Sequence, residues 1–129
     1  MDQGFAWRPG SVSFRTLIDG GACMTTLETK SELTLRSETL RAIQVPFTVP
    51  RKSLFRRVGR IEVGSIFDTK QLEIAAGDYC LVFETGLTGE DQMWCGFSLM
   101  PQVAAAAAIL RNDGLLSPPD SLLMEAEPA

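Results

Sequence analysis

The chain has 129 residues and a net charge of −4, with 45% hydrophobic and 22% charged residues, which fits one globular domain that buries its own core. It contains no histidine, and this excludes imidazole-based triads, histidine general bases and histidine metal sites. Before residue 101 there are 12 acidic and 11 basic residues, a balance that argues against a large uniform basic footprint for nucleic acid.

The N-terminus begins Met1-Asp2-Gln3, which is acidic and polar rather than basic and apolar. It therefore lacks the features of a secretory signal. No segment reaches the run of about 20 apolar residues that spans a bilayer. We expect a cytoplasmic protein without a membrane span.

Trp7 and Arg8 follow within the first ten residues. Tryptophan and arginine are the residue types most enriched at the energetic centres of protein interfaces, so both are candidates for binding a protein partner. The alternative is structural, with the arginine stacked on the indole and Phe5 and Trp7 anchoring the terminal segment to the core.

Apolar and polar residues alternate along most of the chain up to residue 99. Alternation with a period of two is typical of strands that bury one face. The turn sequence Asp19-Gly20-Gly21 predicts a hairpin between residues 14–18 and 22–28. Pro46, which removes a ladder donor, predicts a sheet edge or a bulge at its position. The prediction is an all-β fold, an antiparallel β-sandwich or a partly open barrel. Its strands fall in residues 12–18, 32–36, 43–49, 61–63, 72–74, 79–84 and 93–99.

Residues 51–60 hold five basic residues and one aromatic, Phe55. One interpretation is a loop that binds nucleic acid or another phosphate ligand. The other is a solvated loop between two strands, which is the commoner role of a charge run. The basic residues are Arg51, Lys52, Arg56, Arg57 and Arg60.

The three cysteines are Cys23, Cys80 and Cys95. An odd number at wide spacing is neither a disulfide framework nor a zinc motif, so we expect buried thiols, with a disulfide between neighbouring strands as the alternative. No glycine-rich phosphate loop is present. The carboxylates occur singly, and only a pair such as Glu62 and Glu73 would suit acid–base chemistry. We predict no catalytic residues, metal or cofactor.

Residues 101–129 differ in composition from the rest of the chain. The alanines at 103–110 predict a short helix, because alanine has the highest helix propensity. Pro118-Pro119 and the acidic end predict a partly disordered tail. We therefore expect a β-sandwich domain at residues 1–100 followed by a tail at residues 101–129.

Four segments, in order, make the chain resemble the competence protein J family. They are Gln-Gly-Phe-Ala-Trp-Arg-Pro-Gly-Ser-Val-Ser-Phe at 3–14, Arg-Ala-Ile-Gln-Val-Pro-Phe-Thr-Val at 41–49, Ile-Glu-Val-Gly-Ser-Ile at 61–66, and Gly-Asp-Tyr leading into Leu-Val-Phe-Glu at 77–84. The first two segments are the more specific. The resemblance implies a non-enzymatic protein of DNA uptake that binds and blocks a DNA-entry nuclease.

An inhibitor of a nucleic-acid enzyme often presents acids where the substrate phosphates would lie. Under that interpretation Asp78, Glu84, Glu90 and Asp91 join Trp7 and Arg8 as partner-binding candidates. The family pattern also has a further strand before the first segment, so the start of this chain is truncated, misassigned or a short form. A missing strand would leave an open sheet edge, which predicts a homodimer.

Overall fold

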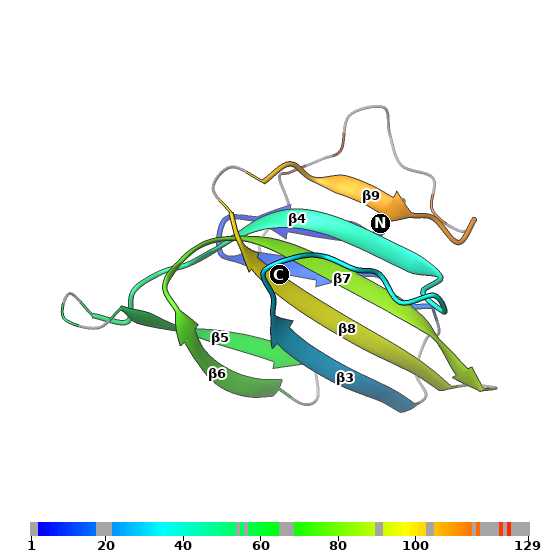
Figure 1. Cartoon of the computed structure of the whole chain (residues 1–129), viewed down its shortest axis with the longest axis horizontal. Helices are drawn as coiled ribbons and strands as arrows, with labels where there is room; N and C mark the ends of the chain where they lie inside the picture. The colour runs from blue at the N-terminus through cyan, green and yellow to red at the C-terminus, as the bar shows by residue number, and fades with distance from the viewer. Residues whose placement is uncertain are drawn as a thin grey trace.

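The computed structural model describes residues 3–17, 22–53, 55, 57–64, 69–89, 92–102, 105–114, 116, 122 and 124. This part of the chain contains nine strands and no helix (Figure 1). Five of the strands form the main sheet, in the order β3-β8-β7-β4-β9. Their bounds are β3 Ala22–Thr29, β8 Gln92–Pro101, β7 Gly77–Gly89, β4 Arg41–Val49 and β9 Ala108–Arg111.

Two further pairs of strands each form a two-stranded sheet. They are β1 (Phe5–Arg8) with β2 (Ser11–Phe14), and β5 (Val58–Gly64) with β6 (Thr69–Ala75). Phe5 of β1 and Ile61 of β5 share one hydrophobic cluster with Ile43, Val45 and Leu81 of the main sheet. The small sheets therefore pack on one face of the large one, and the predicted all-β sandwich is confirmed.

The opposite face of the main sheet is covered by the chain between β3 and β4. Leu33 and Leu35 from this segment pack against a smaller cluster of buried residues on β7 and β8. In Figure 1 the segment crosses in front of the sheet, while β1 and β2 lie behind it. The buried residues of that cluster are Cys80, Val82, Met100 and Ala105.

The predicted hairpin through residues 19–21 is wrong. Strand β2 pairs with β1, and β3 pairs with β8 in parallel. A turn signal reports only local chain reversal, and alternation is the same in parallel and antiparallel strands, so neither fixes the partner. The hairpin that forms has Pro9 and Gly10 between Arg8 and Ser11. Gly10 has a φ of 82°, which suits the third position of a type II turn after proline. Residues 18–21 lie outside the described residues.

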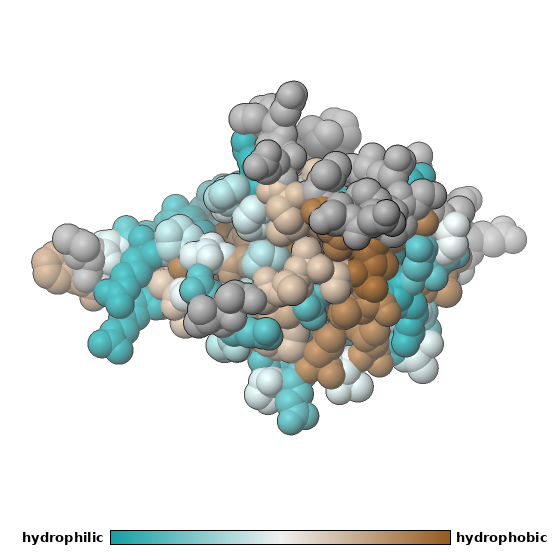
Figure 2. Space-filling model, turned by 90° about the horizontal axis from the view of Figure 1, so that it is seen from above, coloured by the Kyte–Doolittle hydropathy of each residue, from teal (hydrophilic) through white to brown (hydrophobic). Residues whose placement is uncertain are grey.

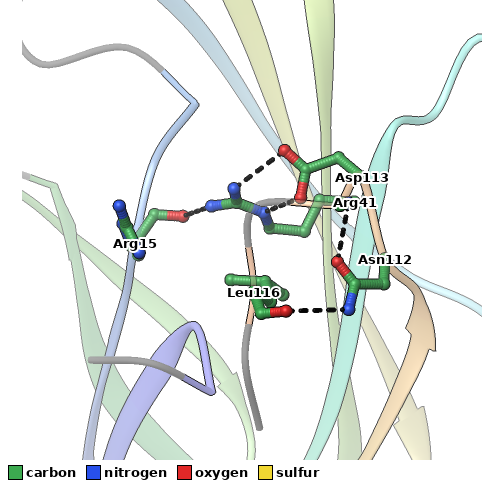
Figure 3. Close-up of polar contacts among 6 residues, drawn as sticks. Arg15, Arg41, Asn112, Asp113 and Leu116 are labelled. Atoms are coloured by element: carbon green, nitrogen blue, oxygen red, sulfur yellow. Dashed lines mark hydrogen bonds and ion pairs between the residues drawn. The ribbon is translucent and has the colours of Figure 1, made fainter.

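The predicted C-terminal helix is also wrong, because Ala108–Arg111 is strand β9. Helices this short are marginal alone, whereas the edge of β4 offers backbone partners for every added residue. Strand β9 pairs with Ala42, Ile43 and Gln44 of β4. Beyond it, the side-chain amide of Asn112 donates to the backbone carbonyl of Leu116 (Figure 3). The side chain of Leu116 is buried in the main hydrophobic cluster.

Pro46 lies in the part of β4 where the described residues of β9 no longer pair. It faces Cys80 of β7 on its other side. Strand β4 as a whole is an inner strand of the sheet, so the predicted edge applies at most to this part of β4. Cys80 and Cys95 are buried, as predicted. The side chain of Cys23 lies outside the described residues.

Candidate functional site

The connection from β4 to β5 extends from one end of the molecule (Figure 1). We call residues 50–60 the basic projection. The charges of Arg51, Lys52, Arg57 and Arg60 are all exposed. Figure 2 shows this projecting end as mostly hydrophilic. Arg56, the fifth predicted base, lies outside the described residues.

Backbone hydrogen bonds hold the two ends of the basic projection in place. The amide of Lys52 donates to the carbonyl of Val58 at 2.9 Å, and the amide of Ala76 donates to the carbonyl of Arg57 at 2.9 Å. Gly59 lies so close to Pro50 that a Cβ at this position would collide with the Pro50 carbonyl oxygen. The two ends of the loop are thereby fixed against each other and against β6.

Phe55 is the most exposed large hydrophobic residue of the described chain, at 96%. In the same segment, Lys52 forms an ion pair with Glu73 of β6 at 3.0 Å. Both side chains of this pair are partly exposed, so its contribution to stability is small. One exposed aromatic ring and four exposed basic residues thus lie on the same short segment of the chain.

Trp7 is bound to the main sheet rather than presented to solvent. Its indole Nε1 donates to the carbonyl oxygen of Pro46 at 2.8 Å. That carbonyl belongs to the stretch of β4 left open beyond β9. Arg8 is half-buried at the end of β1. The contact of Trp7 favours the structural alternative, an anchor for the N-terminal hairpin.

The predicted acids do not form one surface. Asp78 is exposed at the start of β7 and accepts a hydrogen bond from the Thr48 hydroxyl at 2.7 Å. Glu84 is only 2% exposed. Its carboxylate accepts from the Thr39 hydroxyl at 2.6 Å and from the Arg36 amide at 3.2 Å. Glu84 therefore holds the turn before β4 and is out of reach of a partner. Glu90 and Asp91 lie outside the described residues.

Glu62 and Glu73, the two acids considered for acid–base chemistry, take different partners. The Gln71 amide donates to Glu62 at 2.9 Å, and Glu73 pairs with Lys52. The register of β5 and β6 places Glu62 opposite Gln71 and Arg60 opposite Glu73. The two carboxylates are therefore offset along the hairpin rather than directly opposed.

A second surface was missed in the sequence, and we call it the Trp94 surface. Trp94 itself is buried, at 6% exposed, and the guanidinium carbon of Arg36 lies 4.7 Å from the centre of its ring. Met24 of β3 is the register partner of Trp94 and is 73% exposed. The ring lies against Gly86, where a Cβ would be 2.6 Å from its Nε1. Glycine within a strand pattern signals such a close approach, and Gly86 was the available clue.

The turn beside this surface is held from several sides. The Leu40 amide donates to the Thr85 carbonyl at 2.9 Å. The guanidinium of Arg111 in β9 donates to the Thr39 carbonyl at 2.8 Å. With the two bonds to Glu84, these contacts fix Arg36 over the indole before any partner binds.

Within the described residues, no group of three or more His, Cys, Asp or Glu side chains is placed to hold a metal ion. No helix of the described chain has the length and apolar character needed to cross a membrane.

A protein-family model described as competence protein J (ComJ) matches residues 1–100. The match runs from the N-terminal hairpin to β8 and includes both the basic projection and the Trp94 surface. It ends before β9. No curated protein and no solved structure matches the chain.

Proposed function

The chain belongs to the competence protein J family, and from this premise we propose that it binds a nuclease that acts in DNA uptake and blocks it without being an enzyme itself. Membership gives the protein a role in competence. The observation that carries the proposal is the family match, which covers 100 of the 129 residues.

The Trp94 surface is the contact that we assign to the nuclease. It offers Arg36, a residue type that contributes strongly to interface energetics, and the exposed Met24, which adapts to varied partner shapes. Trp94 is only 6% exposed and packs against the Arg36 guanidinium. Because the turn that carries Arg36 is already fixed by Glu84, little side-chain or loop ordering is needed on binding.

The neighbouring edge of the sheet supports the same assignment. Strand β3 is an edge strand of the main sheet. Natural edge strands are usually protected by lysine, proline or a bulge. Residues 22–29 have neither lysine nor proline, and Glu28 is their only charge. A strand of the nuclease added at this edge would lie beside Met24. A homodimer through β3 would use the same backbone groups and compete with the nuclease.

An inhibition assay with a competence nuclease from the same organism tests the proposal. We expect the wild-type chain to inhibit DNA cleavage at micromolar concentration or below. Met24→Lys adds a charge that protects edges and should weaken inhibition at least tenfold. Leu110→Lys is the matched control, because Leu110 is an exposed residue on the opposite edge strand, and it should inhibit like wild type.

The outcomes separate the two parts of the proposal. No inhibition by the wild-type chain, with no complex detected by size-exclusion chromatography, would refute nuclease binding. Full inhibition by Met24→Lys would refute the Trp94 surface and β3 as the contact and leave nuclease binding in place.

A further inference from the structure

We propose that the basic projection binds single-stranded nucleic acid, with Phe55 stacked on a base and Arg51, Arg57 and Arg60 in contact with phosphates. This activity does not depend on nuclease binding, because the projection and the Trp94 surface share no residue.

The three arginines are available for a ligand. Each is exposed, and the ion pairs found among the described residues involve none of them. Lys52 differs, because Glu73 already takes its charge. Guanidinium groups bind phosphate oxygens through two parallel hydrogen bonds, so this end of the protein offers three such donors on one short segment.

The exposure of Phe55 supports a stacking role. A ring that is 96% exposed gains nothing from the core and leaves its apolar faces in water. Every nucleic-acid base has a flat face that can cover such a ring, and proteins that bind single strands combine aromatic side chains with cations in this way. In a duplex the base faces are already stacked on each other. The ring therefore favours a single strand.

The composition of the projection fits nucleic acid better than a protein partner. The centres of protein interfaces are depleted of charge, whereas interfaces with nucleic acid are polar and strongly positive. Here the only exposed aromatic ring of the described chain lies in a segment whose described basic residues, Arg51, Lys52, Arg57 and Arg60, are also exposed.

Charge is also distributed unevenly between this end and the rest of the molecule. Residues 50–76 have six bases and three acids, and all other residues together have six bases and thirteen acids. The remainder repels a polyanion while the projection attracts it. A nucleic-acid strand is thereby confined to the end of the molecule that carries Phe55.

The two ends of the basic projection are held in place, so fewer of its residues need to become ordered when a ligand binds. The hydrogen bond from Lys52 to Val58 and the bond from Ala76 to Arg57 fix the segments that carry Arg51 and Arg57. Arg60 lies on β5 in register with β6. The phosphate-binding arginines are therefore attached to the β5–β6 sheet, and binding a ligand costs less conformational entropy than it would on a flexible loop.

The test is fluorescence anisotropy with the full chain and a fluorescein-labelled single-stranded DNA of 12 nucleotides and mixed sequence, at 20 to 200 mM NaCl. Three phosphate contacts predict a slope of about −2 for log affinity against log salt. Affinity should then fall by about twentyfold between 50 and 200 mM. The same sequence as a duplex should bind more weakly.

Two variants divide the site into its parts, and circular dichroism checks that each is folded. The triple variant Arg51→Ala, Arg57→Ala and Arg60→Ala should lose binding and its salt dependence. Phe55→Ala should lose about tenfold in affinity with an unchanged salt slope. The matched control is Arg8→Ala, Arg15→Ala and Lys30→Ala, which changes the net charge equally, away from the projection, and should bind like wild type.

Several results would overturn the proposal. One is no anisotropy change at 20 mM salt with 100 μM protein. A second is equal loss of binding in the triple variant and its matched control, which would show a general charge effect. A third is equal affinity for a poly-glutamate peptide of the same charge, which would identify a site for acidic polymers. A fourth is unchanged affinity in Phe55→Ala, which would remove the stacking contact.

Discussion

Arg41 and Asp113 form a bidentate ion pair inside the protein (Figure 3). The Nε and Nη2 atoms of Arg41 lie 3.1 and 2.9 Å from the two carboxylate oxygens, and Nη1 donates to the Arg15 carbonyl at 2.8 Å. The two side chains are only 1% and 8% exposed. The pair joins the start of β4 to the chain beyond β9. Asp113 lies outside the residues that match the family, so this segment completes the domain.

Replacing Asp113 with alanine should destabilise the protein strongly. The change removes the carboxylate that neutralises the buried guanidinium of Arg41 and leaves its hydrogen bond to the Arg15 carbonyl. Breaking a buried pair by removing one member costs about 3–5 kcal/mol. We expect a free energy of unfolding lower by that amount, measured by urea denaturation.

The double variant Arg41→Met with Asp113→Leu is the control, because it removes both charges and keeps apolar volume. It should be more stable than Asp113→Ala alone. A loss below about 1 kcal/mol in Asp113→Ala would be typical of an exposed pair and would contradict the buried role.

Trp7→Phe tests the anchor of the N-terminal hairpin. Phenylalanine keeps an aromatic ring but lacks the donor that binds the Pro46 carbonyl. The loss of this hydrogen bond should lower the free energy of unfolding by about 1 kcal/mol. Trp94 remains as the fluorescent reporter for urea unfolding. An unchanged midpoint would mean that the bond to Pro46 does not hold the hairpin.

Alternation along the sequence located the three inner strands of the main sheet well. Residues 43–49, 79–84 and 93–99 fall within β4, β7 and β8. Their apolar residues recur with the period of two that strands have. The parallel pairing of β3 with β8 was not predictable in this way. This pairing depends on which strand of the sheet has an unpaired edge, and that follows only from the arrangement of all the strands.

The candidate site shows the same limit. Exposure of the basic projection followed from its charge, since unpaired arginines avoid the interior. Burial of Glu84 did not follow, because it depends on the Thr39 hydroxyl and the Arg36 amide, which lie more than 40 residues away. The stacking of Arg36 on Trp94 joins residues that are even farther apart in the chain. Only the glycine at 86 marked that contact in the sequence.

Gly86→Ala should destabilise the protein and disturb the Trp94 surface. A Cβ at this position would lie 2.6 Å from the Trp94 Nε1 and 2.8 Å from the Glu38 carbonyl oxygen. Overpacking of this kind costs about 1–3 kcal/mol. Gly89→Ala is the matched control on the same strand, because a Cβ at Gly89 would lie 3.8 Å from its nearest neighbour, the Gln92 Oε1 atom. Equal stability of the two variants in urea would contradict the close packing of Trp94 on β7.

Cys80 should make stability depend on pH in the alkaline range. Burial raises the pKa of its thiol above the ordinary value, which is about 8.5 in an unfolded chain. Below that pH both states keep the proton, so the thiol adds nothing that varies with pH. Above it the unfolded chain loses the proton while the native protein retains it, and stability falls by up to about 1.4 kcal/mol per pH unit until the native thiol ionises.

Urea unfolding of wild type and Cys80→Ala at pH 7, 8.5 and 10 isolates this effect, because all other groups titrate in both proteins. We expect the advantage of wild type over the variant to be largest at pH 7, slightly smaller at pH 8.5 and much smaller at pH 10. A difference that stays constant over the whole range would show that the Cys80 thiol ionises equally in the native and unfolded states.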